Sequence, residues 1–287
     1  MLEGKRIEEL RLTSWNEFPA ALERLAELQR ADSDRRFLEP LFRGLGNSKW
    51  KLETTLERSS DADFQETLLG YYRAIARSKP TVESLTKRNW DPIPDLRSFE
   101  RLLREDETET ADWIDQTLSK NPAIYEYLIY LRHHGFPSPL LDWTASPYIA
   151  AMFAFDAMDR DAEEVLIYAY IRGSFQMFGN NAHLFIVGPY LRTHPRHYLQ
   201  QSRYSLCLQR QVIDFQVDYC FLPHTEVITG TIWNKDLIVK IFIPATERKQ
   251  ALLQLDSMNI NPYSLYGSEE SLIRTMARRE MLFKKEF

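Results

Sequence analysis

HHGFPSPLLDWTASPYIAAMFAF, residues 133–155, is the stretch of this sequence that most constrains the fold. A glycine and two prolines in its first half forbid a continuous helix, because glycine favours turn conformations and proline lacks a backbone donor. Ser146 followed by Pro147 is a helix-start signal, a capping side chain before proline at the first helical position. The stretch therefore predicts a tight turn followed by a short, buried helix at residues 148–158.

Helical and strand patterns extend outward from that stretch. Residues 14–29 begin with Ser14, three positions before Glu17, and then place leucines at helical spacing, which is typical of a capped amphipathic helix. Further helices are predicted at residues 61–78, 123–133, 247–258 and 268–280. Composition rich in β-branched and aromatic residues predicts strands at residues 164–172, 204–208 and 237–244.

Two segments are less regular. Residues 35–58 lose the helical period and predict a strand, a turn and a second extended piece, with Arg43 at the end of the first strand. Residues 79–121 are rich in charge and contain prolines, but residues 99–103 and 111–118 keep helical apolar spacing. The second segment is therefore interpreted as a helical insertion.

The composition is that of an ordinary globular protein. Hydrophobic residues make up 44% and charged residues 27% of the 287 residues. The mixture of helices and strands predicts an α+β fold, interpreted as a single domain over residues 1–287. The longest apolar run is too short to cross a bilayer, and Cys207 and Cys220 lack metal-binding spacing. A cytoplasmic protein with buried free thiols and no membrane contact is expected.

The charge distribution leaves two interpretations open. The formal net charge of −5 gives the whole molecule no strong attraction to nucleic acid. A local group of arginines is interleaved with tyrosines, namely Arg192, Arg196, Arg203 and Arg210 with Tyr190, Tyr198 and Tyr204. Such a group can form a phosphate-binding face or simply a solvated helix face.

Three blocks of residues follow one another in an order that is typical of one family. Phe42-Arg43-Gly44 precedes Trp50, Leu52, Leu56 and Arg58; His133, Gly135 and Pro137 precede Leu140-Leu141-Asp142-Trp143-Thr144 and Ser146-Pro147; and Pro195-Arg196 precedes Gln200-Gln201 and Tyr204. Together the blocks resemble the FRG-domain family, over roughly residues 15–268.

The resemblance implies a site arranged as in the ADP-ribosyltransferase fold, a mixed sheet core with surrounding helices. In that fold an early strand gives an Arg or His to NAD, a middle strand and helix frame the nicotinamide, and a later strand carries a polar catalytic residue. The implied activity is NAD-dependent ADP-ribosyl transfer, a glycosyltransferase reaction, to a protein or RNA. Such an enzyme harms its host cell, so a toxin or antiviral-defence role is expected, with an antitoxin as a candidate partner.

Arg43 and Gly44 have the chemistry of an anion-binding pair. A guanidinium fork matches two phosphate oxygens, and glycine lets a ligand approach the backbone closely. We therefore expect Arg43 to contact the pyrophosphate of NAD, with a structural ion pair as the alternative.

The residues around the proline-rich turn are the next candidates. His133 and Asp142 flank the turn and are expected to meet there, position the ribose, and let the carboxylate fix the imidazole tautomer. Trp143 is expected to stack on a ligand ring. Thr144 and Ser146 cap the following helix, whose free N–H groups face a ligand. The alternatives are a hydrogen-bonded core pair, core packing for Trp143, and simple capping.

Gln201, directly after Gln200, occupies the place where an ADP-ribosyltransferase carries its catalytic Gln/Glu pair on the third strand. A glutamine can hold a ribose hydroxyl but supplies no charge, so a carboxylate from Glu226 or Asp214 is considered as well. A non-catalytic module that senses a nucleotide or a partner is the main alternative, and a nuclease is a third. No metal is expected, because no metal-binding motif accompanies the histidines.

Overall fold

The structure is a computed structural model that describes residues 6–31, 38–59, 67–104, 121–173, 182–188, 191–213, 216–229 and 236–283. Its strands are β1 (Arg6–Arg11), β2 (Leu41–Leu45), β3 (Leu141–Thr144), β4 (Glu164–Ile171), β5 (Ala182–Val187), β6 (Ser202–Ile213), β7 (Gln216–Phe221) and β8 (Leu237–Pro244). Its helices are α1 (Phe18–Arg30), α2 (Thr55–Ser59), α3 (Leu68–Thr86), α4 (Leu96–Arg104), α6 (Pro122–His133), α7 (Pro147–Asp156), α8 (Pro195–Leu199), α9 (His224–Thr229), α10 (Arg248–Ser257), α11 (Pro262–Tyr266) and α12 (Glu269–Ala277). Short 3₁₀ turns, Trp15–Glu17 and Ala245–Glu247, precede α1 and α10, and a π-helical turn, Arg278–Phe283, follows α12.

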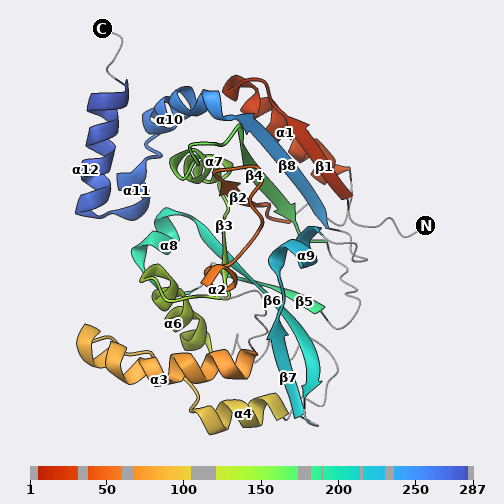
Figure 1. Ribbon diagram of the computed structural model, residues 1–287, viewed down its shortest axis with the longest axis vertical. Coiled ribbons are helices and arrows are strands. Elements are labelled where there is room, and N and C mark those ends of the chain that lie inside the picture. The colour runs from red at the N-terminus through yellow and green to blue at the C-terminus, as the bar shows by residue number, and fades with distance from the viewer. Residues whose placement is uncertain are drawn as a thin grey trace.

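The strands form one eight-stranded mixed sheet in the order β1-β8-β4-β2-β3-β6-β5, with β7 paired to β6 (Figure 1). β1 runs parallel to β8, and the other neighbours are antiparallel. A mixed sheet surrounded by helices confirms the predicted α+β class. Within the described ranges, no helix combines the length and the apolar character that a membrane crossing requires.

The sheet has a narrow junction between β2 and β3. β2 pairs with β4 along its whole length, from Leu41 to Leu45. Across the junction the paired residues are Phe42 on β2 and Thr144 on β3. We call this junction the seam. It divides the sheet into an α7 half, made of β1, β8, β4 and β2, and an α6 half, made of β3, β6, β5 and β7.

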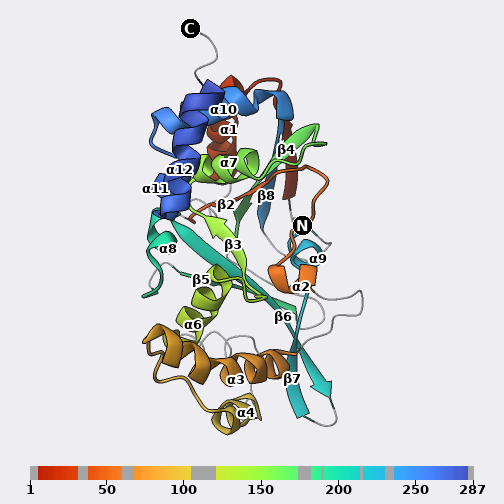
Figure 2. The same cartoon turned by 60° about the vertical axis from the view of Figure 1, so that its left-hand side comes forward.

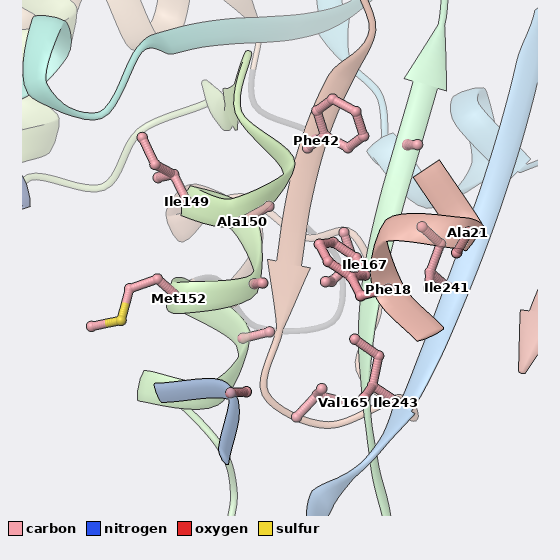
Figure 3. Packing of buried hydrophobic residues seen from close by; sticks show 14 of the residues in the cluster. Phe18, Ala21, Phe42, Ile149, Ala150, Met152, Val165, Ile167, Ile241 and Ile243 are labelled. Carbon is pink, nitrogen blue, oxygen red and sulfur yellow. The ribbon is translucent and has the colours of Figure 1, made fainter. Parts of the chain in front are cut away.

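Helices α1, α7 and α10 cover one face of the α7 half with aliphatic side chains (Figure 3). Ile167 of β4 and Ile241 of β8 are fully buried there, opposite Ala150 of α7. Gly44 on β2 permits this packing, because a Cβ at that position would lie 1.9 Å from the carbonyl oxygen of Ala150. The glycine therefore fixes how closely α7 lies against the sheet.

Helices α3, α4 and α6 pack on the α6 half at the opposite end of the molecule (Figure 2). This core is rich in aromatic rings, and Tyr72 of α3 stacks on Phe99 of α4 with their centroids 3.7 Å apart. Tyr204 of β6 is fully buried in the same cluster. A third cluster, on the other face of the sheet, includes Leu41 and Trp143 and spans both halves.

Several predicted elements are confirmed, with corrections at their ends. The helix predicted at residues 14–29 begins as the 3₁₀ turn, and Ser14 accepts a hydrogen bond from the Asn16 N–H. Ser14 is therefore the capping residue, as predicted, and the Glu17 carboxylate accepts the N–H of Thr13. The helices predicted at 123–133, 148–158, 247–258 and 268–280 correspond to α6, α7, α10 and α12. Both cysteines are buried, and neither forms a disulfide.

Other predictions were wrong in position or type. Arg43 lies in the middle of β2, not at its end, and the predicted second extended piece contains the helix α2. The helix predicted at 61–78 corresponds to α3, which begins at Leu68 and continues through Pro80 to Thr86, whereas residues 61–66 lie outside the described residues. Ion pairs of Lys79 with Glu83 and Asp91 stabilise the turn that contains Pro80. The strand predicted at 204–208 is the longer β6, which three neighbouring strands stabilise. The helical spacing at 111–118 lies outside the described residues.

Candidate functional site

A cavity of about 280 Å³ lies at the seam, between α7 on one side and α8 on the other. The residues that line it come from both halves of the sheet and from the C-terminal helices: Phe42, Arg43, Gly44, His133, Asp142, Trp143, Thr144, Phe153, Asp156, Ala157, Arg196, Gln200, Ser202 and Tyr266. Six of these, Arg43, Gly44, His133, Asp142, Trp143 and Thr144, are predicted site residues whose side chain or backbone reaches the cavity. The narrow pairing at the seam leaves room for the cavity.

Arg43 reaches across the seam from β2. Its Nη1 donates a hydrogen bond of 2.6 Å to the Asp142 carbonyl oxygen on β3. Its Nε is buried and has no hydrogen-bond partner among the described residues. Burial lowers the pKa of Arg43 to about 10, against the opposing effect of Asp142, and the neighbouring Arg132 and Arg58 lower it further. Arg43 therefore stays charged at neutral pH and keeps one unused donor at the cavity.

Asp142 is held by Arg132, the last arginine of α6. The Nε and Nη2 of Arg132 donate to the two carboxylate oxygens of Asp142, and its Nη1 lies 3.2 Å from the Thr55 hydroxyl. Burial disfavours the charged form of Asp142, but the Arg132 fork outweighs it, so the pKa of Asp142 is lowered. His133 and Asp142 line the same cavity, as predicted, but the Asp142 carboxylate does not fix the His133 tautomer, because both of its oxygens accept hydrogen bonds from Arg132.

His133 instead faces Tyr204. Its Nε2 lies 3.4 Å from the Tyr204 hydroxyl, which is also 3.4 Å from Nδ1 of His197. Burial lowers the pKa of His133 to about 4, despite Asp142 nearby, and His194, Arg132 and Arg196 lower it further. His133 is therefore a neutral imidazole at pH 7, at the boundary between the cavity and the α6 half.

Arg196 places a second guanidinium at the cavity. It lies in α8, and its guanidinium carbon is 5.3 Å from the centroid of the Tyr266 ring. Like the Nε of Arg43, the Nε of Arg196 is buried without a hydrogen-bond partner among the described residues. Two buried N–H donors on positively charged groups thus line one cavity. Buried donors of this kind are costly unless a ligand accepts from them.

The predicted capping residues have the expected local role. Ser146 caps α7, because its hydroxyl accepts the Ile149 N–H at 3.3 Å. Thr144 donates from its hydroxyl to the Gln200 carbonyl at 2.7 Å and accepts the Ser146 N–H. Thr144 lines the cavity, whereas Ser146 is not among the lining residues. Simple capping explains Ser146, and Thr144 also ties β3 to the end of α8.

Trp143 and Gln201 are not positioned as predicted. Trp143 is 3% exposed, and its Nε1 donates to the Ser205 hydroxyl at 2.8 Å inside the third core cluster. Strand alternation turns its ring away from Asp142, so it packs in the core instead of stacking on a ligand.

Gln201 lies in an exposed turn before β6, with φ at 48°, and does not line the cavity. Gln200 lines it instead, and its amide donates to the Leu265 carbonyl.

The carboxylates at the cavity are all in ion pairs. Asp142 is paired with Arg132, and Asp156 at the end of α7 is paired with Arg274 and Arg278. Glu226 lies on α9 and is not a lining residue, and Asp214 lies outside the described residues. Within the described part of the chain, no three His, Cys, Asp or Glu side chains are grouped to hold a metal ion.

Sequence reasoning missed Arg132, Asp156 and Tyr266 as parts of this site. The signal for Arg132 was present, because an arginine near the end of the largely apolar helix α6 needs a buried acidic partner. Asp156 likewise ends the apolar helix α7. No local pattern marks Tyr266, which reaches the cavity only because α11 packs beside α8. Arg196 was noted only as part of an arginine cluster.

Comparison with protein families supports the predicted relationship. The FRG domain model matches residues 39–163, which include β2, β3 and α7 and end directly before β4. Comparison with curated proteins and with solved structures gave no match. Arg43, His133 and Asp142 lie within the matched residues, whereas Arg196 and Tyr266 lie beyond them. Residues 39–163 are therefore similar to the FRG domain, and residues beyond that range, among them Arg196 and Tyr266, complete the cavity.

Proposed function

We propose that the cavity binds NAD and that the protein transfers ADP-ribose from NAD to a macromolecule. One observation carries the proposal: Arg43 and Arg196, from opposite sides of one cavity, each keep a buried Nε with no partner among the described residues. Two guanidinium groups with free donors are suited to a pyrophosphate, which offers oxygens on two adjacent phosphorus atoms. The partly buried aromatic rings of Phe153 and Tyr266 offer apolar surface to a base or nicotinamide.

The proposed reaction breaks the bond between C1′ of the ribose and the nicotinamide nitrogen. The electron pair leaves with nicotinamide, and a nucleophile of the acceptor forms a new bond to C1′ and gives up its proton. Neutral His133 lines the cavity and is able to accept that proton or to hold a ribose hydroxyl. Asp142, whose side chain is 42% exposed, places negative charge near the positive charge that develops on the ribose.

The biological role follows from the chemistry. Consumption of NAD and modification of a macromolecule damage the cell that contains the enzyme. We therefore infer a toxin or antiviral-defence effector whose activity is held in check by an antitoxin partner. Growth arrest upon expression, relieved by an Arg43 variant, is the expected phenotype.

A non-catalytic sensor is the second candidate, and a specific observation favours it. Both carboxylates at the cavity, Asp142 and Asp156, are engaged by arginines, which reduces the charge available to an oxocarbenium-like transition state. Gln201 also lies outside the cavity. A sensor would bind NAD or ADP-ribose through the same arginines and release no nicotinamide.

Calorimetry and a nicotinamide-release assay with the Arg43→Ala variant test both candidates. We expect this variant to bind NAD at least about 100-fold more weakly, since a charged hydrogen-bonded group contributes a few kcal/mol. Arg43→Lys should be nearly as weak, because an ammonium lacks the fork. Arg160→Ala, at an exposed position outside the cavity, is the matched control.

The outcomes separate the roles of Arg43. NAD binding with labelled product in wild type, lost in Arg43→Ala at an unchanged melting temperature, supports the transferase. Binding without nicotinamide release supports the sensor. Unchanged affinity together with a sharply lower melting temperature would instead assign Arg43 to a structural ion pair and contradict both candidates.

A further inference from the structure

A second hollow, of about 320 Å³, lies next to the cavity on the α6 half. Arg88, Tyr130, Arg192 and Tyr198 are among the residues that line it. His194 also lines this hollow, and its ring centroid is 5.8 Å from that of His133, which lines the cavity. The two spaces are therefore neighbours, separated by a pair of histidine rings.

Two arginines give the hollow unpaired positive charge. Arg88 and Arg192 are both exposed, and neither side chain contacts a carboxylate among the described residues. The one acidic lining residue, Glu126, accepts the backbone N–H of Arg192 at 3.0 Å, so its charge is partly satisfied by the backbone. The hollow is thus a local cationic site on a chain whose net charge is −5.

The hollow also offers a fixed aromatic ring. Tyr198 is 58% exposed, and its hydroxyl donates to the Leu191 carbonyl at 2.7 Å, which restrains the ring while leaving its surface open to solvent. Deeper in the hollow, Tyr130 stacks on His134, and the Arg88 guanidinium lies 5.1 Å from the Tyr130 centroid. An exposed ring whose position is already fixed loses little entropy when a flat group stacks on it.

Thr193 adds an unused polar group. Its Oγ1 is buried at the hollow and has no hydrogen-bond partner among the described residues. A buried hydroxyl without a partner is unusual, and a phosphate or sugar oxygen of a ligand would satisfy it. Cations, a restrained aromatic ring and an unsatisfied hydroxyl are together the features of a site for an unpaired nucleotide.

We propose that this hollow binds single-stranded nucleic acid, with a base stacked on Tyr198 and phosphates at Arg88 and Arg192, and that it presents the acceptor nucleotide to the cavity beside His133. The proposal rests on the proposed function for its acceptor role, but strand binding can be measured independently. An acidic peptide would satisfy the arginines, whereas it would leave the exposed Tyr198 ring without a stacking partner. The aromatic ring therefore favours a nucleic acid over a protein acceptor.

Fluorescence anisotropy with labelled twelve-nucleotide strands of mixed sequence tests the proposal, with RNA and DNA strands as separate arms. Tyr198→Ala should weaken binding about 5- to 100-fold, the effect expected for the loss of one stacked base. Arg88→Ala and Arg192→Ala should each lower the slope of log affinity against log salt concentration by about 0.7. Tyr263→Ala and Arg30→Ala, at exposed positions on α11 and α1, are the matched controls and should leave both quantities unchanged.

The experiment distinguishes a failure of the strand-binding proposal from a failure of the NAD-binding proposal. If wild type binds the strand and only the Tyr198, Arg88 and Arg192 variants lose it, the site is supported whether or not NAD binds, and NAD titration of these variants should match wild type. Equal binding by wild type and all three variants overturns the proposal. So does an absence of strand binding by wild type, or a preference for a duplex or an acidic peptide of the same length.

Discussion

The two halves of the sheet differ in the kinds of side chain that pack on them. The α7 half is held by long strand pairings and by mainly aliphatic side chains under α1, α7 and α10, with a few aromatic rings such as Trp15 and Phe155 and with the α7 backbone close to Gly44. The α6 half places aromatic rings, histidines and the Arg132–Asp142 ion pair around β3 and β6. The difference indicates a division of roles: one half is a close-packed support, and the other contributes most of the titratable groups to the site.

The seam is where the two roles meet. The backbone of Arg43 pairs with β4 in the α7 half, whereas its guanidinium reaches β3 and forms part of the site. We therefore expect the stability of the protein to depend on side-chain volume in the α7 half, and on side-chain charge and pH in the α6 half. Three variants test this comparison.

The largest effect is expected from Gly44→Ala. The new Cβ would lie 1.9 Å from the Ala150 carbonyl oxygen and 2.8 Å from the Ala154 backbone nitrogen, and backbone atoms of α7 cannot rotate away. We expect a loss of at least about 3 kcal/mol in the free energy of unfolding, measured by urea denaturation. Gly267→Ala is the matched control: its φ is 63° and its nearest contact 3.8 Å, so the left-handed backbone alone should cost about 1 kcal/mol. Equal losses in the two variants would contradict close packing at Gly44.

A smaller loss is expected from Asp142→Asn. The change keeps the shape of the side chain but leaves Arg132, which is 9% exposed, without its negative partner. We expect about 2 kcal/mol of destabilisation, below the usual cost of breaking a buried pair because the Asp142 side chain is 42% exposed. Arg132→Met in the same background should recover part of the loss, as measured by thermal unfolding. A double variant no more stable than Asp142→Asn would contradict the pairing.

The smallest effect is a pH dependence that His133 causes. In the unfolded chain this imidazole takes up a proton near pH 6.5, but in the folded protein its pKa is about 4. Its contribution to stability is therefore complete above pH 6.5 and is lost as the pH falls from 6.5 towards 4. We expect the free energy of unfolding to fall by about 1 to 2 kcal/mol between pH 7 and pH 5, as measured by urea denaturation at each pH. His133→Gln should flatten this part of the profile, and His194→Gln, whose pKa is also lowered, serves as the comparison.

The sequence predicted most of the longer helices and several strands well, because apolar periodicity reports burial directly, but it missed the short helices α2, α8, α9 and α11. It predicted that Arg43 and Asp142 share one site, and the 2.6 Å hydrogen bond between them bears this out. It did not predict that Arg132 would displace His133 at Asp142, because that choice depends on the direction in which α6 ends. Gln201 was assigned to a strand because sequence alone does not reveal its left-handed turn. β1, β5 and β7 were missed because each owes its strand form to partners distant in the chain.

The parallel pairing of β1 with β8 has a consequence for synthesis. β1 is the first described strand to leave the ribosome and β8 the last, so β1 has no partner strand until β8 has been synthesised. β4 also lacks one neighbour until β8 emerges, and pairing across such a long loop is a slow step. Tyr266 follows β8, and the cavity gains its α11 wall only after that strand. Until α11 has been synthesised, the chain therefore lacks part of the cavity wall.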